Sequence, residues 1–353
     1  MSRQSHGGST YVALSGGIGG AKLSLGLARL LGSDPSHPRF PQDHVHADEG
    51  SDPRLTVIVN TGDDFGHLGL AISPDVDTAL YTLAGIVNPE TGWGRRGETW
   101  TFMEALARLG GPTWFRLGDG DLAMHVDRTR RLKAGETLTE FCAHAAKRLG
   151  ITARILPMTD DPLRTVLDTD AGTLAFQEYF VREQCRPAVR SIGFEGAGGT
   201  RPSPQILAAL SAPTLAGIVI CPSNPWLSVD PILAVPGMRT ALKASGAPIV
   251  AVSPIVAGKA LKGPAAKIMG ELGLAASSVS VARHYAGLID GFVIDTADAA
   301  LVPDLGVPAL VTNTVMRTLD DKIALARNCL DFCARLADKT GAPRTMQRAS
   351  ATP

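Results

Sequence analysis

Residues 11–23 constrain the fold more than any other part of the chain, because they read as a strand, a glycine turn and an amphipathic helix in succession. The glycines let the backbone approach an anion, and the free amides at the start of the helix point at it. Lys22 adds a positive charge one turn into that helix. The turn therefore predicts a phosphate site, formed by Gly16, Gly17, Gly19 and Lys22.

Two named fingerprints nearly fit this turn and both fail. A dinucleotide-binding G-x-G-x-x-G needs glycine where Lys22 stands, and a Walker loop needs Ser or Thr where Leu23 stands. Without that hydroxyl, any magnesium ligands must come from elsewhere in the chain. A tight turn that binds no ligand is the alternative interpretation.

The rest of the chain alternates between strand and helix patterns. A continuous β-branched run at 55–59 follows the first helix, and later strands are predicted at 216–220, 248–252, 291–294 and 308–311. This alternation predicts an α/β, Rossmann-like fold, with a mostly parallel sheet and helices on both faces. Ligands of such a sheet lie beyond the carboxyl ends of its strands.

Residues 154–196 break the pattern, because alternating segments at 165–169 and 173–177 flank a turn and indicate a hairpin. We therefore predict a small antiparallel insertion and divide the chain accordingly. The predicted units are 11–150 and 201–337 as the two parts of the core, 151–200 as the insertion, and 1–10 and 338–353 as flexible tails. The Pro-, His- and Asp-rich stretch 32–54 is predicted to be a surface loop.

Composition limits the partners. The chain has 34 basic and 34 acidic residues, so no global field favours nucleic acid or an anionic membrane. Its five cysteines are odd in number and lack C-x-x-C spacing, which argues against a disulfide framework or a zinc site. Cys329 and Cys333 are predicted to pack inside the protein. No run of about 18 apolar residues occurs, so we expect a soluble cytoplasmic protein with no nucleic-acid or membrane partner.

Acidic residues concentrate after the strand at 55–59. Asn60 and Thr61 follow that strand and are candidate binding residues. The aspartates come within a short stretch after them: Asp63, Asp64, Asp75 and Asp77. Carboxylate oxygens are the ligands that Mg²⁺ prefers, so these four residues are the predicted metal ligands. Asp63 and Asp64 could instead form an Asx turn. Asp75 and Asp77 also fit the first turn of a helix with Ser73 as its N-cap, which is compatible with facing a cleft.

Three further segments carry candidate binding residues. Arg95 and Arg96 lie in a segment flanked by tryptophans and suit phosphate, carboxylate or a planar ring. Ser223 and Asn224 follow the predicted strand at 216–220 and suit recognition of a base or ribose. Lys259 belongs to a lysine-rich turn that either neutralises a diphosphate or forms a solvated surface.

Taken in order, these motifs resemble those of the 2-phospho-L-lactate transferase family of coenzyme F420 biosynthesis. They are SGG at 15–17 through Lys22, NTGDD at 60–64, SPDVDT at 73–78, LGD at 117–119 through His125, PSNP at 222–225, PGMR at 236–239 and SPIV at 253–256 through Gly263-Pro264. The resemblance covers most of residues 11–320. It implies a Rossmann-like, Mg²⁺-dependent phosphotransferase, often a homodimer. Such an enzyme joins the deazaflavin Fo (7,8-didemethyl-8-hydroxy-5-deazariboflavin) to a phosphorylated three-carbon acid, delivered as a guanosine diphosphate ester, and releases GMP.

The resemblance also implies roles for residues. Asp75 and Arg95 or Arg96 would contact Fo, while the glycine turn, Ser223, Asn224 and Lys259 would hold the guanosine diphosphate. As proton acceptor we favour Asp75 over Asp64. Where relatives commonly read GDRDLATH, this chain reads GDGDLAMH at 118–125, and the sequence leaves lactate, enolpyruvate and glycerate open. A non-catalytic nucleotide-sugar-binding regulator of related fold and a nicotinamide-dependent oxidoreductase are the competing interpretations.

Overall fold

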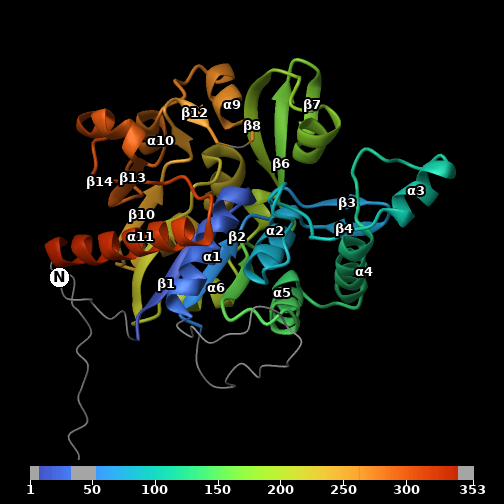
Figure 1. Ribbon diagram of the computed structural model, residues 1–353, viewed down its shortest axis with the longest axis horizontal. Coiled ribbons are helices and arrows are strands. Elements are labelled where there is room, and N and C mark those ends of the chain that lie inside the picture. Colours follow the sequence, from blue (N-terminus) through green and yellow to red (C-terminus); the bar gives the residue numbers. More distant parts are fainter. Residues whose placement is uncertain (1–7, 33–52, 262, 341–353) are drawn as a thin grey trace, which may run out of the picture.

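A seven-stranded parallel sheet forms the centre of the molecule, with the order β14-β13-β10-β9-β1-β2-β5 (Figure 1). The computed structural model describes residues 8–32, 53–261 and 263–340. The strands of this sheet are β1 (Thr10–Ser15), β2 (Leu55–Val59), β5 (Arg154–Pro157), β9 (Leu215–Ile220), β10 (Ile249–Val252), β13 (Gly291–Asp295) and β14 (Ala309–Thr312).

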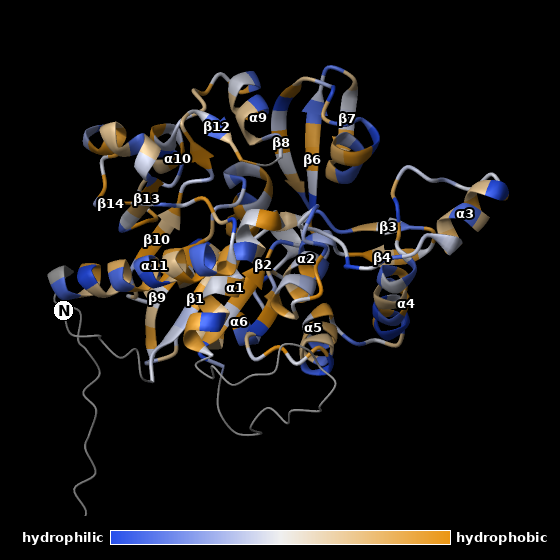
Figure 2. Ribbon diagram, in the orientation of Figure 1, coloured by the Kyte–Doolittle hydropathy of each residue, from blue (hydrophilic) through white to orange (hydrophobic). Residues whose placement is uncertain are grey.

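Helices cover both faces of this sheet because successive side chains of each strand point to opposite sides. In β1, Tyr11 and Ala13 pack into one apolar cluster, whereas Val12 and Leu14 pack into the other. The first face is covered by α1 (Gly17–Leu31), α2 (Pro74–Leu83), α5 (Leu138–Arg148) and α11 (Leu319–Thr340). The opposite face is covered by α6 (Pro204–Leu210), α7 (Asp230–Ala234), α8 (Met238–Ala244), α9 (Ala265–Glu271) and α10 (Ser278–His284). Colouring by hydropathy shows the central strands as predominantly apolar (Figure 2).

The strand order reverses at β1. From β1 the sheet extends through β2 to β5 on one side and through β9 and β10 to β14 on the other. Open parallel sheets bind ligands at such a switch point, in the crevice outside the carboxyl ends of the strands. The segments that leave β1, β2 and β9 therefore define where a site is expected.

Smaller antiparallel sheets flank the core. They are the hairpin β3 (Phe65–His67) with β4 (Leu70–Ile72), the unit β6 (Arg164–Thr169), β7 (Gly172–Ala175) and β8 (Val189–Glu195), and the hairpin β11 (Ile255–Val256) with β12 (Lys259–Ala260). Helices α3 (Thr101–Arg108) and α4 (Asp119–Lys133) lie beside β3 and β4 in Figure 1.

The predicted α/β class, its parallel strands and the β6–β7 hairpin are confirmed. One predicted boundary is wrong, because Arg154–Pro157 is not part of the antiparallel unit. It pairs in parallel with β2 as the edge of the main sheet. The division of the chain into domains otherwise stays a prediction.

The chain ends also differ slightly from expectation. Thr10 already belongs to β1, and α11 continues to Thr340, so residue 10 and residues 338–340 are not part of the flexible tails predicted from the sequence. The predicted loop at 32–54 falls mostly outside the described residues, as do 1–7 and 341–353. Cys329 and Cys333 are buried on α11 with free thiols, as expected. In the described part of the chain, no helix combines the length and apolar character needed to cross a membrane.

Candidate functional site

The glycine turn after β1 packs against the segment that leaves β9. The Ser223 hydroxyl donates to the Gly16 carbonyl at 2.7 Å and accepts from the Gly16 N–H at 3.3 Å. A Cβ on Gly19 would lie 2.1 Å from the Pro222 carbonyl oxygen, so this glycine is required by packing between two protein segments. Gly17 has a φ of +58° and open space around it, and it begins α1 two residues earlier than Gly19. Of these glycines, Gly17 best fits the predicted close approach of a ligand.

Asp75 joins this turn to the acidic segment after β2. Its Oδ1 accepts the Gly17 N–H at 2.8 Å, and its Oδ2 accepts the Asn60 side-chain amide at 2.9 Å. The carboxyl group thus lies where the N-termini of α1 and α2 meet. Burial raises the pKa of Asp75 to about 6, against the lowering effect of the hydrogen bonds from Asn60 and Gly17. Asp75 is therefore a buried carboxyl group with a raised pKa, and its role as proton acceptor stays a prediction.

Asp63 and Asp64 form the acidic segment that follows β2. Among the described residues, Oδ1 of each is buried without a hydrogen bond, while the Ser73 hydroxyl donates to Oδ2 of Asp64 at 2.7 Å. Burial raises the pKa of both carboxyl groups, and the nearby charge of Asp75 raises that of Asp63 further. Buried carboxylate oxygens without donors are costly, and a bound cation would satisfy them. The structure brings Asp63, Asp64 and Asp75 together as the sequence predicted.

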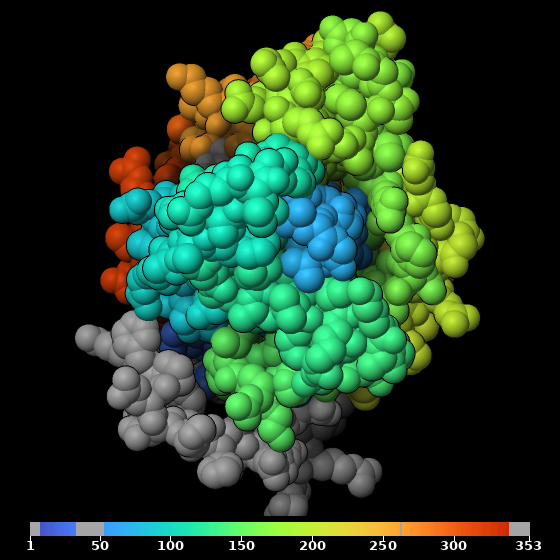
Figure 3. Space-filling model, turned by 90° about the vertical axis from the view of Figure 1, so that its right-hand side faces the viewer, coloured from blue at the N-terminus to red at the C-terminus, as the bar shows by residue number. Residues whose placement is uncertain are grey.

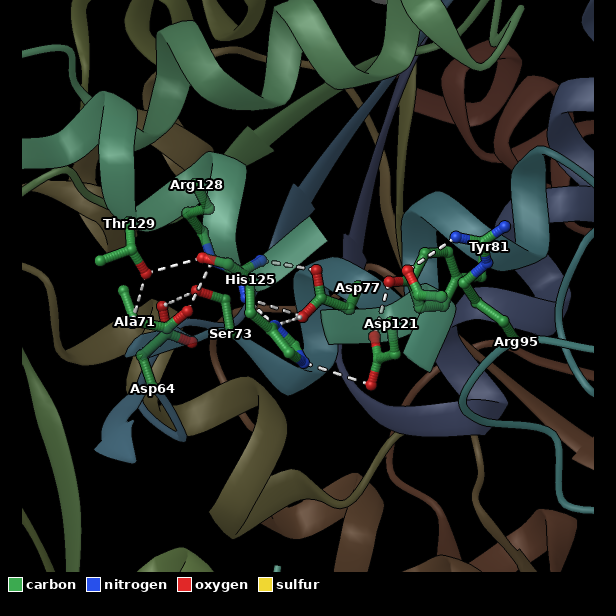
Figure 4. Close-up of polar contacts among 11 residues, drawn as sticks. Asp64, Ala71, Ser73, Asp77, Tyr81, Arg95, Asp121, His125, Arg128 and Thr129 are labelled. Carbon is green, nitrogen blue, oxygen red and sulfur yellow. Dashed lines mark hydrogen bonds and ion pairs between the residues drawn. The ribbon is translucent and has the colours of Figure 1, made fainter. Parts of the chain in front are cut away.

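Asp77, the fourth predicted ligand, is already paired. The fully buried guanidinium of Arg128 donates to both of its oxygens, at 2.6 and 3.0 Å (Figure 4). The same guanidinium donates to the Ala71 carbonyl at 3.0 Å and contacts Nδ1 of His125 at 2.6 Å. Because Arg128 neutralises Asp77, we remove Asp77 from the proposed metal ligands. Its role is to tie α2, which carries Asp75, to α4.

A second group on α4 extends this network. His125 Nε2 lies 3.2 Å from Asp121, and Asp121 accepts the Tyr81 hydroxyl at 2.6 Å (Figure 4). Asp77, Asp121 and His125 offer ligand atoms within 4.8 Å of one another. Arg128 lies against both Asp77 and His125, however, so a cation there would meet a fixed positive charge.

Asn224 is held in place by its side-chain oxygen. Its Oδ1 accepts the N–H groups of Trp226 and Leu227 at 3.1 and 3.3 Å, which caps the helical turn that follows β9. Its Nδ2 is buried and, within the described residues, has no hydrogen-bond partner. Ser223 and Asn224 therefore lie at the switch point beside the glycine turn, and the Asn224 amide remains available to a ligand.

The four predicted cations are Lys22, Arg95, Arg96 and Lys259. Lys22 donates to the Met316 carbonyl at 3.2 Å, and Arg96 donates to the Gly85 carbonyl at 3.3 Å. Arg95 donates to the Gly120 carbonyl at 2.8 Å, and Lys259 is exposed on β12. No contact among the described residues brings any of these four side chains to Asp63, Asp64 or Asp75. Their predicted ligand contacts stay predictions.

A pocket of about 480 Å³ opens beside Asp63 and Asp64. It lies between the loop after β2 and the β6–β7 hairpin. A hydrogen bond from the Thr165 N–H to the Gly62 carbonyl, at 2.7 Å, joins these two segments. Figure 3 shows this face of the molecule, on which the β3–β4 segment lies between the α3–α4 segment and the antiparallel unit. The pocket was not predicted from the sequence, because its walls come from segments more than 100 residues apart, such as those of His67 and Phe176.

The fold and this geometry define a Rossmann-like enzyme with a glycine turn and an acidic cluster at the switch point of its sheet. The chain belongs to the 2-phospho-L-lactate transferase CofD family, whose model matches residues 11–304. It is a transferase of a phosphate-containing group in coenzyme F420 biosynthesis.

Individual relatives agree with this assignment. A phosphoenolpyruvate transferase of Streptomyces griseus is 39% identical over 330 residues, covering 91% of this chain and 97% of the relative. One of Mycobacterium avium is 41% identical over 318 residues, covering 85% and 93%. A crystal structure of a UPF0052 family member from Bacillus halodurans covers 91% of this chain and 98% of its own, with a TM-score of 0.57 at 16% identity. That last likeness shows the fold alone.

Proposed function

We propose that this enzyme transfers a phosphoenolpyruvyl group from a guanosine diphosphate ester to the terminal ribityl hydroxyl of Fo and releases GMP, with Mg²⁺ as its cofactor. The observation that carries the proposal is that, among the described residues, one buried oxygen of Asp63 and one of Asp64 have no hydrogen-bond partner. The choice of enolpyruvyl rests on similarity, since relatives at 39% and 41% identity are named phosphoenolpyruvate transferase.

The residues fit a hard divalent cation. Among the described residues, Asp63 and Asp64 each supply a buried oxygen that lacks a donor, and burial raises the pKa of both carboxyl groups. Mg²⁺ bound here would neutralise charge on the diphosphate, which is the main demand of phosphoryl transfer. We assign Asp63 and Asp64 as its ligands, and Asp75 as their neighbour.

The protein's own residues accept the proton and hold the substrates during the transfer. The hydroxyl oxygen of Fo forms a bond to the β-phosphorus, the bond from that phosphorus to the GMP oxygen breaks, and the hydroxyl proton passes to Asp75. Gly17 and Asn60 hold the Asp75 carboxyl group by hydrogen bonds, and a pKa of about 6 suits a proton acceptor near neutral pH. Ser223 fixes the glycine turn, and the Asn224 amide donates to the guanosine portion of the donor.

The direct test offers purified protein Fo, Mg²⁺ and, separately, the lactate, enolpyruvate and glycerate esters of guanosine diphosphate. We expect GMP release and a product whose mass corresponds to the enolpyruvyl adduct, formed fastest with the enolpyruvate ester. Binding of the ester without GMP release would instead support the non-catalytic regulator. Equal rates with the lactate ester would contradict the choice of enolpyruvyl.

Replacing Asn224 by Asp separates its two functions. Aspartate keeps the oxygen that caps Trp226 and Leu227 but removes the amide donor and adds negative charge. We expect the KM for the guanosine donor to rise about tenfold or more, with a small change in thermal stability. Asn224→Ala, which also removes the cap, is expected to lower stability in addition. A change confined to the KM for Fo would reverse the assignment of the two pockets.

Stabilisation by Mg²⁺ is expected to depend on pH. The pKa of Asp75 rises from its ordinary value of 3.8 to about 6 in the folded protein, and the pKa values of Asp63 and Asp64 rise as well. Without a cation, the contribution of Asp75 to stability is therefore fully present below about pH 4 and lost as the pH rises through about 6. The contributions of Asp63 and Asp64 have the same sign and are likewise lost when these carboxyl groups ionise. Because Mg²⁺ binds the ionised carboxylates, it should raise the Tm much more at about pH 8 than at about pH 5.

Thermal unfolding with and without MgCl₂ at the two pH values measures this effect. The Asp63→Asn/Asp64→Asn double variant should show little response to Mg²⁺ at either pH. An equal Mg²⁺-induced shift of the wild-type Tm at both values would contradict the assignment of these ligands.

A further inference from the structure

A π-helical turn, Pro225–Val229, follows β9 and is buried along its whole length. The Val229 N–H donates to the Asn224 carbonyl at 3.3 Å, five residues back, which is the spacing of a π-helix. Such turns are rare and often occur at functional sites. Because the side-chain oxygen of Asn224 caps this π-helical turn, the turn sets the direction of the Asn224 amide, which we assign to the guanosine portion of the donor.

The π-helical turn packs against both segments that form the candidate site. The Leu227 carbonyl accepts the side-chain amide of Asn60, from the segment after β2, at 3.4 Å. Toward the glycine turn after β1, a Cβ on Gly16 would lie only 2.5 Å from the Cβ of Ser228. A displacement of the π-helical turn would therefore move the Asn224 amide relative to the glycine turn, where the diphosphate is expected.

His284, the last residue of α10, contacts the π-helical turn near both of its ends. Its ring packs against the Trp226 ring with centroids 4.9 Å apart. Its Nε2 lies 2.9 Å from Oδ1 of Asp230, the residue that follows the turn and begins α7. The His284 and Asp230 side chains are only 23% and 16% exposed, so a lost contact would leave a largely buried carboxyl group without its donor. Such a group favours a shift of the segment toward water.

We infer that His284 is a positioning residue for donor binding. Its contacts with Trp226 and Asp230 hold the π-helical turn in the one arrangement that points the Asn224 amide at the guanosine portion, and His284 itself touches no substrate. The inference rests on the proposed function, because that function gives Asn224 its ligand.

Calorimetric titration of the full-length protein with GDP and Mg²⁺, combined with steady-state kinetics, tests this inference. His284→Phe keeps a ring against Trp226 but removes the contact with Asp230. We expect it to weaken GDP binding and to raise the KM for the guanosine donor about fivefold or more, with kcat and the KM for Fo within about twofold of the wild type. His284→Gln, whose amide can still donate to Asp230, should recover most of the GDP affinity.

Two further variants show whether the effect passes through the π-helical turn. Asp230→Ala breaks the same contact from the other side, so it should reproduce the effect of His284→Phe and also decides the matter if His284→Phe does not fold. In the Asn224→Asp background the amide donor is already absent, so adding His284→Phe should weaken GDP binding no further. His144→Phe is the matched control, because His144 contacts Arg131 at 2.8 Å on α5, and it should bind GDP as the wild type does.

Thermal unfolding identifies the folded variants. GDP affinity equal to that of the wild type in folded His284→Phe or Asp230→Ala would overturn the inference, as would a further loss in the Asn224→Asp background. Equal losses in kcat and in Fo affinity would also overturn it, since they indicate a general structural role. If the wild type binds GDP but releases no GMP from the esters, the proposed function fails while the GDP titrations still test His284. If the wild type binds no GDP, both fail.

Discussion

The Asp75→Asn variant is expected to lose about 100-fold or more in kcat while remaining folded. Asparagine cannot take up a proton, and its amide nitrogen cannot accept a hydrogen bond in place of the carboxylate oxygen that now accepts from Gly17 or from Asn60. One of these donors then lacks an acceptor, which costs about 1–3 kcal/mol of stability. Steady-state kinetics with both substrates measures the loss, and thermal unfolding verifies the fold.

Asp168→Asn provides the comparison for this variant. Asp168 is exposed on β6, and its replacement removes the same charge as Asp75→Asn does. Because this residue is not part of the site, we expect activity close to that of the wild type. Near-normal turnover by Asp75→Asn would rule out Asp75 as the proton acceptor and would also show that its contact with the glycine turn is dispensable.

The Arg128→Met variant is expected to lose about 3–5 kcal/mol of unfolding free energy, because it leaves Asp77 as an uncompensated buried charge. Arg128 is fully buried and holds Asp77, His125 and the Ala71 carbonyl together. Urea-induced unfolding near neutral pH measures this difference. Activity should fall too, since the contact positions α2 and therefore Asp75.

Two further variants separate the buried pair from a general loss of charge. Arg130→Met removes an exposed arginine of the same helix, paired with Asp127 at 2.8 Å, and should cost less than about 1 kcal/mol. The double variant Arg128→Met/Asp77→Leu should recover much of the loss, because no unpaired charge remains. If Arg128→Met is no more destabilising than Arg130→Met, the Arg128–Asp77 pair does not anchor α2.

Much of the fold could be predicted because its strands are buried on both faces. β2 reads as an uninterrupted β-branched and apolar run, and all five of its residues are buried. β5 was not predicted because its four residues, RILP, begin with a charged residue and end with proline. The segment shows neither the continuous apolar run of a buried strand nor the alternation of a half-buried one. Its assignment to the sheet comes from its pairing with β2, a contact between segments almost 100 residues apart.

The site was predictable only where local patterns carry the chemistry. The glycine turn and the aspartates follow strand ends, so the topology of the sheet brings them together. Arg128 was missed because it lies in a run of charged residues on α4 that resembles a solvated surface. Its spacing of three residues from His125 was the available signal, since both then share one face of the helix.

The most direct test of the central claim is the binding of a divalent cation to Asp63 and Asp64. Paramagnetic Mn²⁺, which prefers the same oxygen ligands as Mg²⁺, can be titrated into the protein with saturating GDP and followed by electron paramagnetic resonance. We predict that the wild type and Asp168→Asn bind one Mn²⁺ tightly, whereas Asp63→Asn/Asp64→Asn binds it about 100-fold or more weakly. Equal Mn²⁺ affinity in all three proteins would contradict the account.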